Sequence, residues 1–240
     1  MEKEQIAYAK KEMIPEMIDL WIEAFGDTRE YVEFYFENRF LEENTMVYLI
    51  EGHPVSMISL LPAAMWLSEQ KQSPVRYVYA VATLKKYRGR GYAQKLIETA
   101  KEWYHVPLIL EPVSQELSQY YEKMGFEEFF YIAEADLKTE GIKQSQKHLL
   151  MTITPEEYKQ IRDKKFGMAG YIEWNEAAVR YALLENDFCG GSAYKIVHDG
   201  KEDLFMYRVE ENKMNIIETT LSDQDVYGVL EALKIVPEQI

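Results

Sequence analysis

The chain has 240 residues, of which 47% are hydrophobic and 28% are charged, and its formal net charge is -14. This length is sufficient for one large domain or two small ones, and the composition is that of a soluble globular protein. An acidic balance disfavours nucleic acid as a partner, because nucleic-acid phosphates favour a broad basic face, and it is compatible with a cationic substrate.

Cysteine and histidine usage limits the chemistry further. Cys189 is the single cysteine, so an internal disulfide is excluded. No Cys/His cluster has the local spacing of a zinc site, so the sequence predicts no metal. The opening residues MEKEQ lack the pattern of a signal peptide, and no run of about 18 apolar residues follows. We therefore expect a cytoplasmic protein without a membrane partner.

Two helices are predicted near the N-terminus. The first has its apolar stripe after Pro15, which suits a first helical turn, and Gly26 is its predicted stop. Thr28 is a good cap for the second helix, which is rich in aromatic residues from Tyr31 to Phe40. These rings form either a buried core with a partly exposed rim or one wall of an acceptor pocket.

An antiparallel meander follows. The runs MVYLI and VSMISLL flank residues 51–54, which indicates a hairpin with a four-residue connection, and the second strand can extend to Leu67. A polar turn then leads into a third strand that includes Val78 and Thr83. Three consecutive antiparallel strands are therefore expected before the central motif.

The segment from Val78 to Tyr104 predicts a strand, a glycine-rich loop and a helix. Its loop and first helical turn carry five cations and no carboxylate within eleven residues. These are Lys85, Lys86, Arg88, Arg90 and Lys95. A helix that starts at a glycine pair presents unpaired N–H groups and a positive dipole end, so the segment predicts an anion site, with a solvated basic turn as the alternative.

The common nucleotide motifs do not fit this loop. The dinucleotide pattern G-x-G-x-x-G requires a third glycine where Gln94 stands, and no G-x-x-x-x-G-K-[ST] occurs in the chain. The anion is therefore expected to belong to another class of ligand.

Downstream, the run VPLILEP predicts a buried strand that lies parallel to the preceding one. A helix that carries Tyr120 and Tyr121 follows and stops near Gly125, and the aromatic residues of 126–132 predict one more strand. Ligands gather at the carboxyl ends of strands in such a sheet.

The remaining sequence predicts a second, smaller α+β half. Thr154, Pro155 and Glu157 form a helix start, another helix covers about 175–185, and a three-stranded meander with an Asp199–Gly200 turn leads to a final helix opened by Ser222. This order echoes the first half without its glycine-rich loop. The aromatic residues Trp174, Tyr181 and Phe188 are either core residues or contacts to an acceptor.

Two motifs carry a resemblance to a known family. The stretch Lys86-Tyr87-Arg88-Gly89-Arg90-Gly91 resembles the coenzyme-A signature Q/R-x-x-G-x-G/A of the GNAT superfamily of acyl-CoA N-acyltransferases, with Lys86 in place of Gln or Arg. About 30 residues on, Tyr121-Glu122-Lys123-Met124-Gly125-Phe126 resembles the family's second motif, with four residues from tyrosine to glycine. The resemblance covers residues from about 5 to 133, and the second half looks like the degenerate half of tandem family members.

The resemblance implies a mixed α/β (α+β) fold, with a mostly antiparallel sheet flanked by helices. It implies an acetyl-CoA-binding domain over 1–135 and a degenerate domain over 136–240. It also implies that the Val81 N–H stabilises the oxyanion, that the backbone of Ala82 and Thr83 holds the pantetheine arm, and that the loop binds the pyrophosphate. The implied coenzyme contacts are Val81, Ala82, Thr83, Lys86, Arg88, Gly89, Arg90, Gly91, Tyr92 and Ala93.

In the family, the tyrosine of the second motif is the usual general acid, which corresponds to Tyr121, with Tyr120 as its competitor. Many members place a glutamate base early in the fourth strand, where this chain has Arg76, Tyr77 and Tyr79. Glu111 is therefore the carboxylate candidate for the base. His53, His105 and a chain of waters stay open as alternatives.

The expected activity is transfer of an acetyl group from acetyl-CoA to a primary amine of a small molecule, by direct attack in a ternary complex. Two alternatives stay open: a noncatalytic acyl-CoA sensor or interaction protein, and an acyltransferase with a protein amine as acceptor or a larger acyl donor. The expected partner is a small-molecule amine, and homodimer formation is left open.

Overall fold

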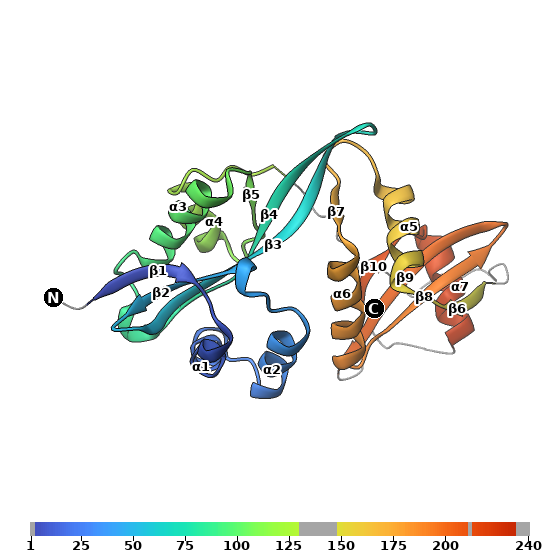
Figure 1. Ribbon diagram of the computed structural model, residues 1–240. Coiled ribbons are helices and arrows are strands. Elements are labelled where there is room, and N and C mark those ends of the chain that lie inside the picture. The colour runs from blue at the N-terminus through green and yellow to red at the C-terminus, as the bar shows by residue number, and fades with distance from the viewer. Residues whose placement is uncertain (1–2, 130–147, 211–212, 234–240) are drawn as a thin grey trace. The chain divides into compact units, whose positions relative to one another are not determined.

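The computed structural model describes residues 3–129, 148–210 and 213–233 (Figure 1). The chain divides into two compact units. Unit 1 comprises residues 1–65 and 72–129, and unit 2 comprises residues 66–71 and 130–240. The domain boundary predicted between 135 and 136 lies outside the described residues.

Unit 1 is a mixed sheet with helices on both faces, as predicted for the fold class. Its strands follow the order β1-β2-β3-β4-β5. The strands are β1 (Glu4–Tyr8), β2 (Thr45–Ile50), β3 (His53–Ser68), β4 (Lys71–Thr83) and β5 (Leu108–Ile109). The helices are α1 (Ile14–Phe25), α2 (Arg29–Asn38), α3 (Tyr92–Tyr104) and α4 (Gln115–Glu122).

The termini of α1 and α2 follow from local sequence. Gly26 ends α1 with φ 81°, and its N–H donates to the Ile22 carbonyl at 2.9 Å. Thr28 caps α2 by accepting the Tyr31 N–H at 3.3 Å. Both predicted boundaries are confirmed.

The β2–β3 hairpin differs from its prediction. The connection has two residues, Glu51 and Gly52, with φ of 51° and 86°, and Ile50 pairs directly with His53. The predicted four-residue connection is therefore wrong. A two-residue turn with positive φ matches the right-handed twist of the strands, and the register shift between Tyr48 and Leu49 admits Pro54 into β3.

The centre of unit 1 is buried on both faces of the sheet. All six residues of β2 are buried. Helices α3 and α4 cover one face, and α1 and α2 cover the other (Figure 1). On the α3 side, Met46 and Tyr48 pack in one core with Leu96 and Ile97, whereas on the other side the Tyr35 hydroxyl donates to Ser59 Oγ at 2.9 Å. A strand buried on both faces explains the continuous apolar run in its sequence.

Unit 2 is built on an antiparallel sheet of order β10-β9-β8-β6. Its strands are β6 (Leu149–Thr152), β8 (Ser192–His198), β9 (Lys201–Glu210) and β10 (Lys213–Thr219), and β7 (Ile172–Trp174) pairs with β3. Its helices are α5 (Pro155–Phe166), α6 (Glu176–Phe188) and α7 (Asp223–Leu233). The predicted meander and its Asp199–Gly200 turn are confirmed, and β6 is an additional edge strand that the sequence did not reveal.

Alternate residues of β9 face opposite helices. Phe205 and Tyr207 pack with α7, whereas Leu204 and Met206 pack with α5 and α6. The capping box of α5 forms as predicted: Thr154 Oγ1 accepts the Glu157 N–H at 3.2 Å, and the Glu157 side chain accepts the Thr154 N–H.

The tip of the β3–β4 hairpin belongs to unit 2. Trp66 donates its N–H to the Tyr171 carbonyl at 2.9 Å and its indole N–H to Glu173 at 2.8 Å. Residues 126–129 have no regular secondary structure, and the rest of the strand predicted over 126–132 lies outside the described residues. Within residues 3–129, 148–210 and 213–233, no helix is long and apolar enough to cross a membrane.

Candidate functional site

The site begins where β4 and β5 part. These parallel strands share only two pairs, Arg76 with Leu108 and Tyr77 with Ile109. β4 then continues alone on that side to Thr83, and Ala80 adopts φ 51° within it. A non-glycine residue in the left-handed region kinks the strand. The backbone of Val81 to Thr83 therefore lies beyond the last rung shared with β5.

Hydrogen bonds hold the end of β4 in place. The Ser56 hydroxyl on β3 donates to the Ala82 carbonyl at 2.8 Å and lies 2.8 Å from the Thr83 hydroxyl. Arg88 Nε donates to the Thr83 carbonyl at 3.0 Å.

The loop after β4 turns into α3 through two glycines. Gly89 and Gly91 have φ of 76° and 79°, and Gly91 is the N-cap of α3 without any side-chain cap. A Cβ at either position would meet no atom within 4 Å, so the positive φ, rather than crowding, is what requires glycine. The Lys95 N–H donates to the Gly91 carbonyl at 2.9 Å. The N–H groups of residues 92–94 precede this first helical bond, so they have no acceptor within the helix.

The cations of the loop are arranged around Tyr87. Lys86 Nζ lies 5.0 Å and the Arg90 guanidinium 5.2 Å from the centroid of the Tyr87 ring. Arg88 is held against Thr83, as described above. Lys95 points elsewhere, because its Nζ donates to the Tyr48 hydroxyl at 3.2 Å, and this bond is the main reason why its pKa is raised. Three of the five predicted cations, Lys86, Arg88 and Arg90, therefore have side-chain contacts within the loop or with the end of β4.

Tyr92 is part of the core and not of the surface. Its ring is 6% exposed and stacks on Tyr48 with centroids 4.2 Å apart. Tyr92 is one of the predicted coenzyme contacts, and because its side chain is buried it can contribute only its backbone N–H. Ala93 is half-buried in the same first turn.

Tyr121 lies on α4, which Ser114 caps by accepting the Leu117 N–H at 3.3 Å. Its side chain is 9% exposed and packs in the same core as Tyr92 and Val81. No hydrogen-bond partner for its hydroxyl occurs among the described residues. Burial, and secondarily the neighbouring Tyr120, raises the pKa of Tyr121, so the phenol stays protonated at neutral pH.

The competitor Tyr120 is more open. It is 37% exposed, and its ring lies 5.4 Å from that of Tyr121. Burial also raises its pKa. Within the described part of the chain, neither hydroxyl has a hydrogen-bond partner, so the rings are positioned by packing.

The candidate bases are scattered. Glu111 is exposed and lies two residues past β5. Burial raises the pKa of Tyr77 to about 12, and the negative charge of Glu111 contributes to this rise. His53 pairs with Glu16 at 2.8 Å, and His105 ends α3 with φ 52°. In the described part of the chain, no hydrogen bond or ring contact joins any of these three to Tyr121.

An open depression of about 440 Å³ lies on another side of unit 1, between β1, β2 and α3. Its lining includes Glu4, Tyr48, Lys95, Glu98 and Glu102. Lys95 is a predicted cation of the anion site, but none of the predicted coenzyme contacts or catalytic residues lines this depression, so the candidate site rests on backbone geometry.

Sequence reasoning missed two residues of the site. Ala80 produces the kink in β4, and alanine carries no sequence signal for a left-handed conformation. The Ser56 hydroxyl contacts the Ala82 carbonyl and the Thr83 hydroxyl, which are 26 and 27 positions away in the sequence. No local sequence pattern reveals such contacts.

The fold is that of an α/β protein in which a kinked strand leads through a glycine-containing loop to the N-terminus of a helix. A family model described as acetyltransferase (GNAT) domain matches residues 5–129, and the chain belongs to this GNAT acetyltransferase family. Among proteins of curated function, no sequence match was found.

Solved structures of similar fold extend over both units. A conserved protein of unknown function from Enterococcus faecalis V583, described as a probable N-acyltransferase, is 19% identical, with a TM-score of 0.71 over 95% of this chain and 61% of its own. A GCN5-related N-acetyltransferase from Anabaena variabilis is 21% identical, with a TM-score of 0.69 and the same two coverages of 95% and 61%. Eis1 from Mycobacterium abscessus is 11% identical, with a TM-score of 0.63 over 98% of this chain and 63% of its own.

At these identities the likeness is one of fold. The chain spans about three fifths of the length of these three structures. What it shares with them is therefore the architecture of both units, whereas activity has to be argued from the site.

Proposed function

We propose that this protein is an N-acetyltransferase that moves an acetyl group from acetyl-CoA to a primary amine of a small molecule, by direct attack in a ternary complex. The observation that carries the proposal is the N-terminus of α3. It follows a kinked strand, opens at two glycines of positive φ and is surrounded by Lys86, Arg88 and Arg90.

This geometry suits a pyrophosphate attached to an extended arm. The N–H groups at the start of α3 and the cationic heads would bind the pyrophosphate. The arm would run along β4, where β5 no longer pairs, and hydrogen-bond with the backbone of Ala82 and Thr83. The Ser56 hydroxyl keeps this part of β4 in place.

The residues then divide the work of thioester aminolysis. The amine nitrogen attacks the thioester carbon, a C–N bond forms, and the carbonyl oxygen becomes an oxyanion that the Val81 N–H would stabilise. As the C–S bond breaks, Tyr121 would donate its phenolic proton to the departing thiolate. The proton released by the amine nitrogen passes to a base, and the Tyr121 phenolate is reprotonated from solvent.

Glu111 is the side chain that we propose as this base. It lies two residues past β5, the strand from which β4 parts after Tyr77. An exposed carboxylate can take the proton directly or through water.

The proposal also covers the organisation of the protein. We assign acetyl-CoA binding to the domain predicted over 1–135, and we propose that the domain predicted over 136–240 is a degenerate half of the same GNAT-like kind. A cytoplasmic location and an acidic surface that attracts a cationic amine complete this picture, since the formal net charge is -14.

The test is release of free coenzyme A thiol from acetyl-CoA by the full chain, with a panel of polyamines, aminoglycosides and amino acids. Turnover that depends on one class of amine supports the proposal. Stabilisation of the protein by acetyl-CoA without turnover on any amine indicates an acyl-CoA sensor, and turnover only on peptide or protein amines indicates a protein acceptor. Absence of both binding and turnover refutes the proposed function.

A further inference from the structure

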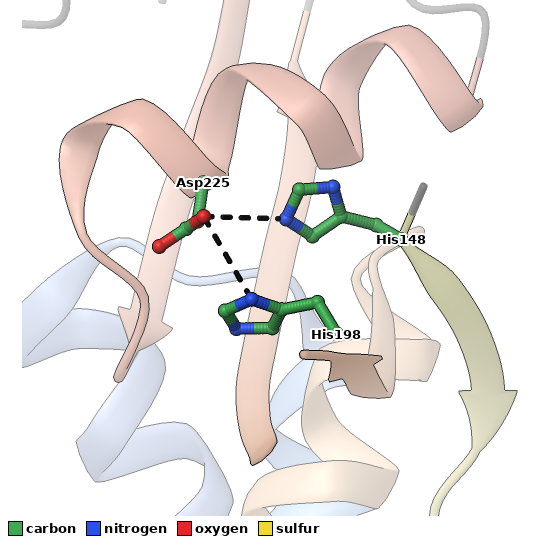
Figure 2. Close-up of side chains that lie close together, drawn as sticks. All are labelled: His148, His198 and Asp225. Atoms are coloured by element: carbon green, nitrogen blue, oxygen red, sulfur yellow. Dashed lines mark ion pairs between the residues drawn. The ribbon is translucent and has the colours of Figure 1, made fainter. Parts of the chain in front are cut away.

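Three side chains that are far apart in the sequence meet in unit 2, at one end of its sheet. His148 directly precedes β6, His198 ends β8, and Asp225 lies in the first turn of α7. Figure 2 shows both imidazole rings turned toward the carboxylate of Asp225. One nitrogen from each histidine and one carboxylate oxygen all lie within 4.8 Å of one another.

The strand register places the histidines side by side. β6 and β8 are antiparallel, with Leu149 opposite Val197 and Leu150 opposite Ile196. One step further along this register, His148 stands opposite His198, and the two ring centroids are 4.9 Å apart. Directly opposed residues share one face of a sheet, so both rings project toward α7.

A buried carboxylate orients His198. Its Nε2 lies 3.1 Å from Asp203 Oδ2, and a carboxylate accepts hydrogen bonds, so the proton of the neutral ring is on Nε2. Asp203 is 2% exposed and is itself held by Lys165 Nζ at 2.5 Å and the Thr220 hydroxyl at 2.7 Å. Nδ1 of His198 is consequently left with its lone pair directed at Asp225.

This Nδ1 is an orphaned polar atom. The His198 side chain is 5% exposed, and its Nδ1 is buried without a hydrogen-bond partner among the described residues. The nearest carboxylate oxygen, Asp225 Oδ1, is 3.8 Å away, too far for a hydrogen bond. A buried lone pair without a partner costs free energy, and a cation between the two atoms would satisfy it.

Asp225 is likewise turned toward the histidines. Its Oδ2 accepts the Ser222 hydroxyl at 2.6 Å, whereas its Oδ1 lies 3.5 Å from His148 Nε2. The side chain of His148 is 1% exposed and that of Asp225 is 30% exposed. The site is thus closed on the protein side and reaches solvent through Asp225.

The spacing of these atoms fits a small metal ion. Ligands at about 2.0–2.1 Å from one tetrahedral ion are about 3.4 Å apart, close to the distances of 3.5 Å and 3.8 Å from Asp225 to the histidines. A shift of the two rings toward each other completes the geometry. A histidine whose second nitrogen donates to a carboxylate, as His198 does to Asp203, is the usual outer-sphere arrangement of a metal ligand.

We propose that His148, His198 and Asp225 bind one divalent transition-metal ion, with Zn²⁺ as the ion whose ligand preferences match best. Two imidazoles and one carboxylate suit Zn²⁺ and disfavour Mg²⁺ or Ca²⁺, which prefer oxygen ligands. The ion joins β6, β8 and α7, so it clamps the helix onto the sheet beside the apolar core that contains Ile196 and Val226. The site is independent of the α3 loop and does not depend on the proposed acetyltransferase activity.

The experiment uses the full chain after treatment with a chelator. Titration with Zn²⁺, followed by calorimetry, is expected to give one ion per chain, and Zn²⁺ is expected to raise the melting temperature, because the ion binds the folded state. Co²⁺ in place of Zn²⁺ is expected to give visible absorption bands of a nitrogen- and oxygen-ligated ion. Nitrogen-15 NMR of the histidines should show metal at Nδ1 of His198 with the proton retained on Nε2.

Three variants separate a metal site from a hydrogen-bonded cluster. His148→Gln and Asp225→Asn are each expected to weaken Zn²⁺ binding at least about 100-fold, and Asp203→Asn about 10- to 100-fold, because it removes the orienting carboxylate. His53→Gln, which alters an exposed histidine of unit 1, is the matched control and should leave binding unchanged. Circular dichroism tests whether each variant is folded. If a variant does not fold, the NMR measurement on the unaltered chain still tests the proposal.

The proposal is refuted if the chelated wild-type protein takes up no stoichiometric Zn²⁺, or if His148→Gln and Asp225→Asn bind it as tightly as His53→Gln does. Either outcome would leave the three side chains as a polar cluster that positions α7. Neither depends on acetyl transfer, so failure of the proposed function and failure of this site are distinguishable.

Discussion

Tyr121 is the residue on which the proposed chemistry depends most. Replacing it by phenylalanine removes the phenolic proton and keeps the ring packed beside Tyr120 and Phe126. We expect Tyr121→Phe to lower kcat about 100-fold or more, the usual contribution of a general acid. Stability should be unaltered, because the hydroxyl has no hydrogen-bond partner among the described residues.

The pH profile adds a second readout for Tyr121. Burial raises its pKa above the ordinary value of about 10, so the acid form persists through neutral pH and is lost only in alkali. The wild-type rate should therefore fall above about pH 10, and the residual rate of Tyr121→Phe should not show this fall. Tyr120→Phe is the control and should keep most of the wild-type kcat. If Tyr120→Phe instead showed the large loss of kcat that we expect for Tyr121→Phe, Tyr120 would be the general acid.

Ala80 is a residue with a conformational role. Its φ of 51° within β4 is unfavourable for a side chain that is branched at Cβ. We expect Ala80→Val to cost about 1–2 kcal/mol in the free energy of unfolding and to lower kcat/KM, because the Val81 N–H would shift. Chemical denaturation and steady-state kinetics measure the two effects.

The control for this position is Ala80→Gly, because glycine adopts positive φ without strain. Its stability should stay within about 1 kcal/mol of wild type, since relief of strain opposes the greater flexibility of the unfolded chain. If Ala80→Val were as stable and as active as wild type, the kink in β4 would have no part in positioning Val81.

At the scale of elements, the turn from β4 into α3 is the feature to alter. Gly89 has φ 76°, so Gly89→Glu adds backbone strain of about 1–2 kcal/mol and a negative charge at the helix end that would receive phosphates. We expect the affinity for coenzyme A to fall at least about tenfold, measured by calorimetry. Gly89→Ala carries the strain without the charge and separates the two causes. Unchanged affinity in Gly89→Glu would place the coenzyme elsewhere.

Most elements follow from short-range signals in the sequence. Thr28 and Thr154 cap helices because a side-chain oxygen reaches an N–H three residues on, and Gly26 ends a helix because it adopts positive φ. These contacts lie within one helical turn, so sequence order alone specifies them. The same reasoning predicts the start of α3 at Gly91.

Other features depend on partners that are distant in sequence. The two-residue β2–β3 turn is selected by strand twist, and its Glu51 gives no sign of positive φ. β5 keeps only two residues, because its ladder with β4 ends at Tyr77. The sequence predicts no metal because its Cys and His residues do not cluster along the chain. The register of β6 and β8 nevertheless brings His148 and His198 together. Such features require the tertiary structure.

At the scale of the whole molecule, both units bury tyrosines whose pKa values are raised. In unit 1, burial is the main reason that the pKa of Tyr77 rises to about 12, and it also raises that of Tyr104. In unit 2, burial raises the pKa values of Tyr158 and Tyr171, and their hydroxyls donate to Glu218 at 2.7 Å and to Asp163 at 2.6 Å. An ionised phenol cannot make these donations.

These shifts predict alkaline unfolding with a definite sign. Unfolded tyrosine loses its proton near pH 10, whereas the buried residues keep theirs to higher pH, so the folded state binds more protons in this window and stability falls as pH rises. The stabilisation is fully present below about pH 10, and the part due to Tyr77 is lost as pH rises through about 12. We expect the melting temperature to be level from about pH 7 to 9 and to fall steadily above about pH 10. Tyr77→Phe removes one titrating group without breaking a hydrogen bond to any described residue, so its melting temperature should fall less steeply over the same range. A melting temperature independent of pH up to about 11, or an equal slope in Tyr77→Phe, would show that these phenols titrate alike in the folded and unfolded chain.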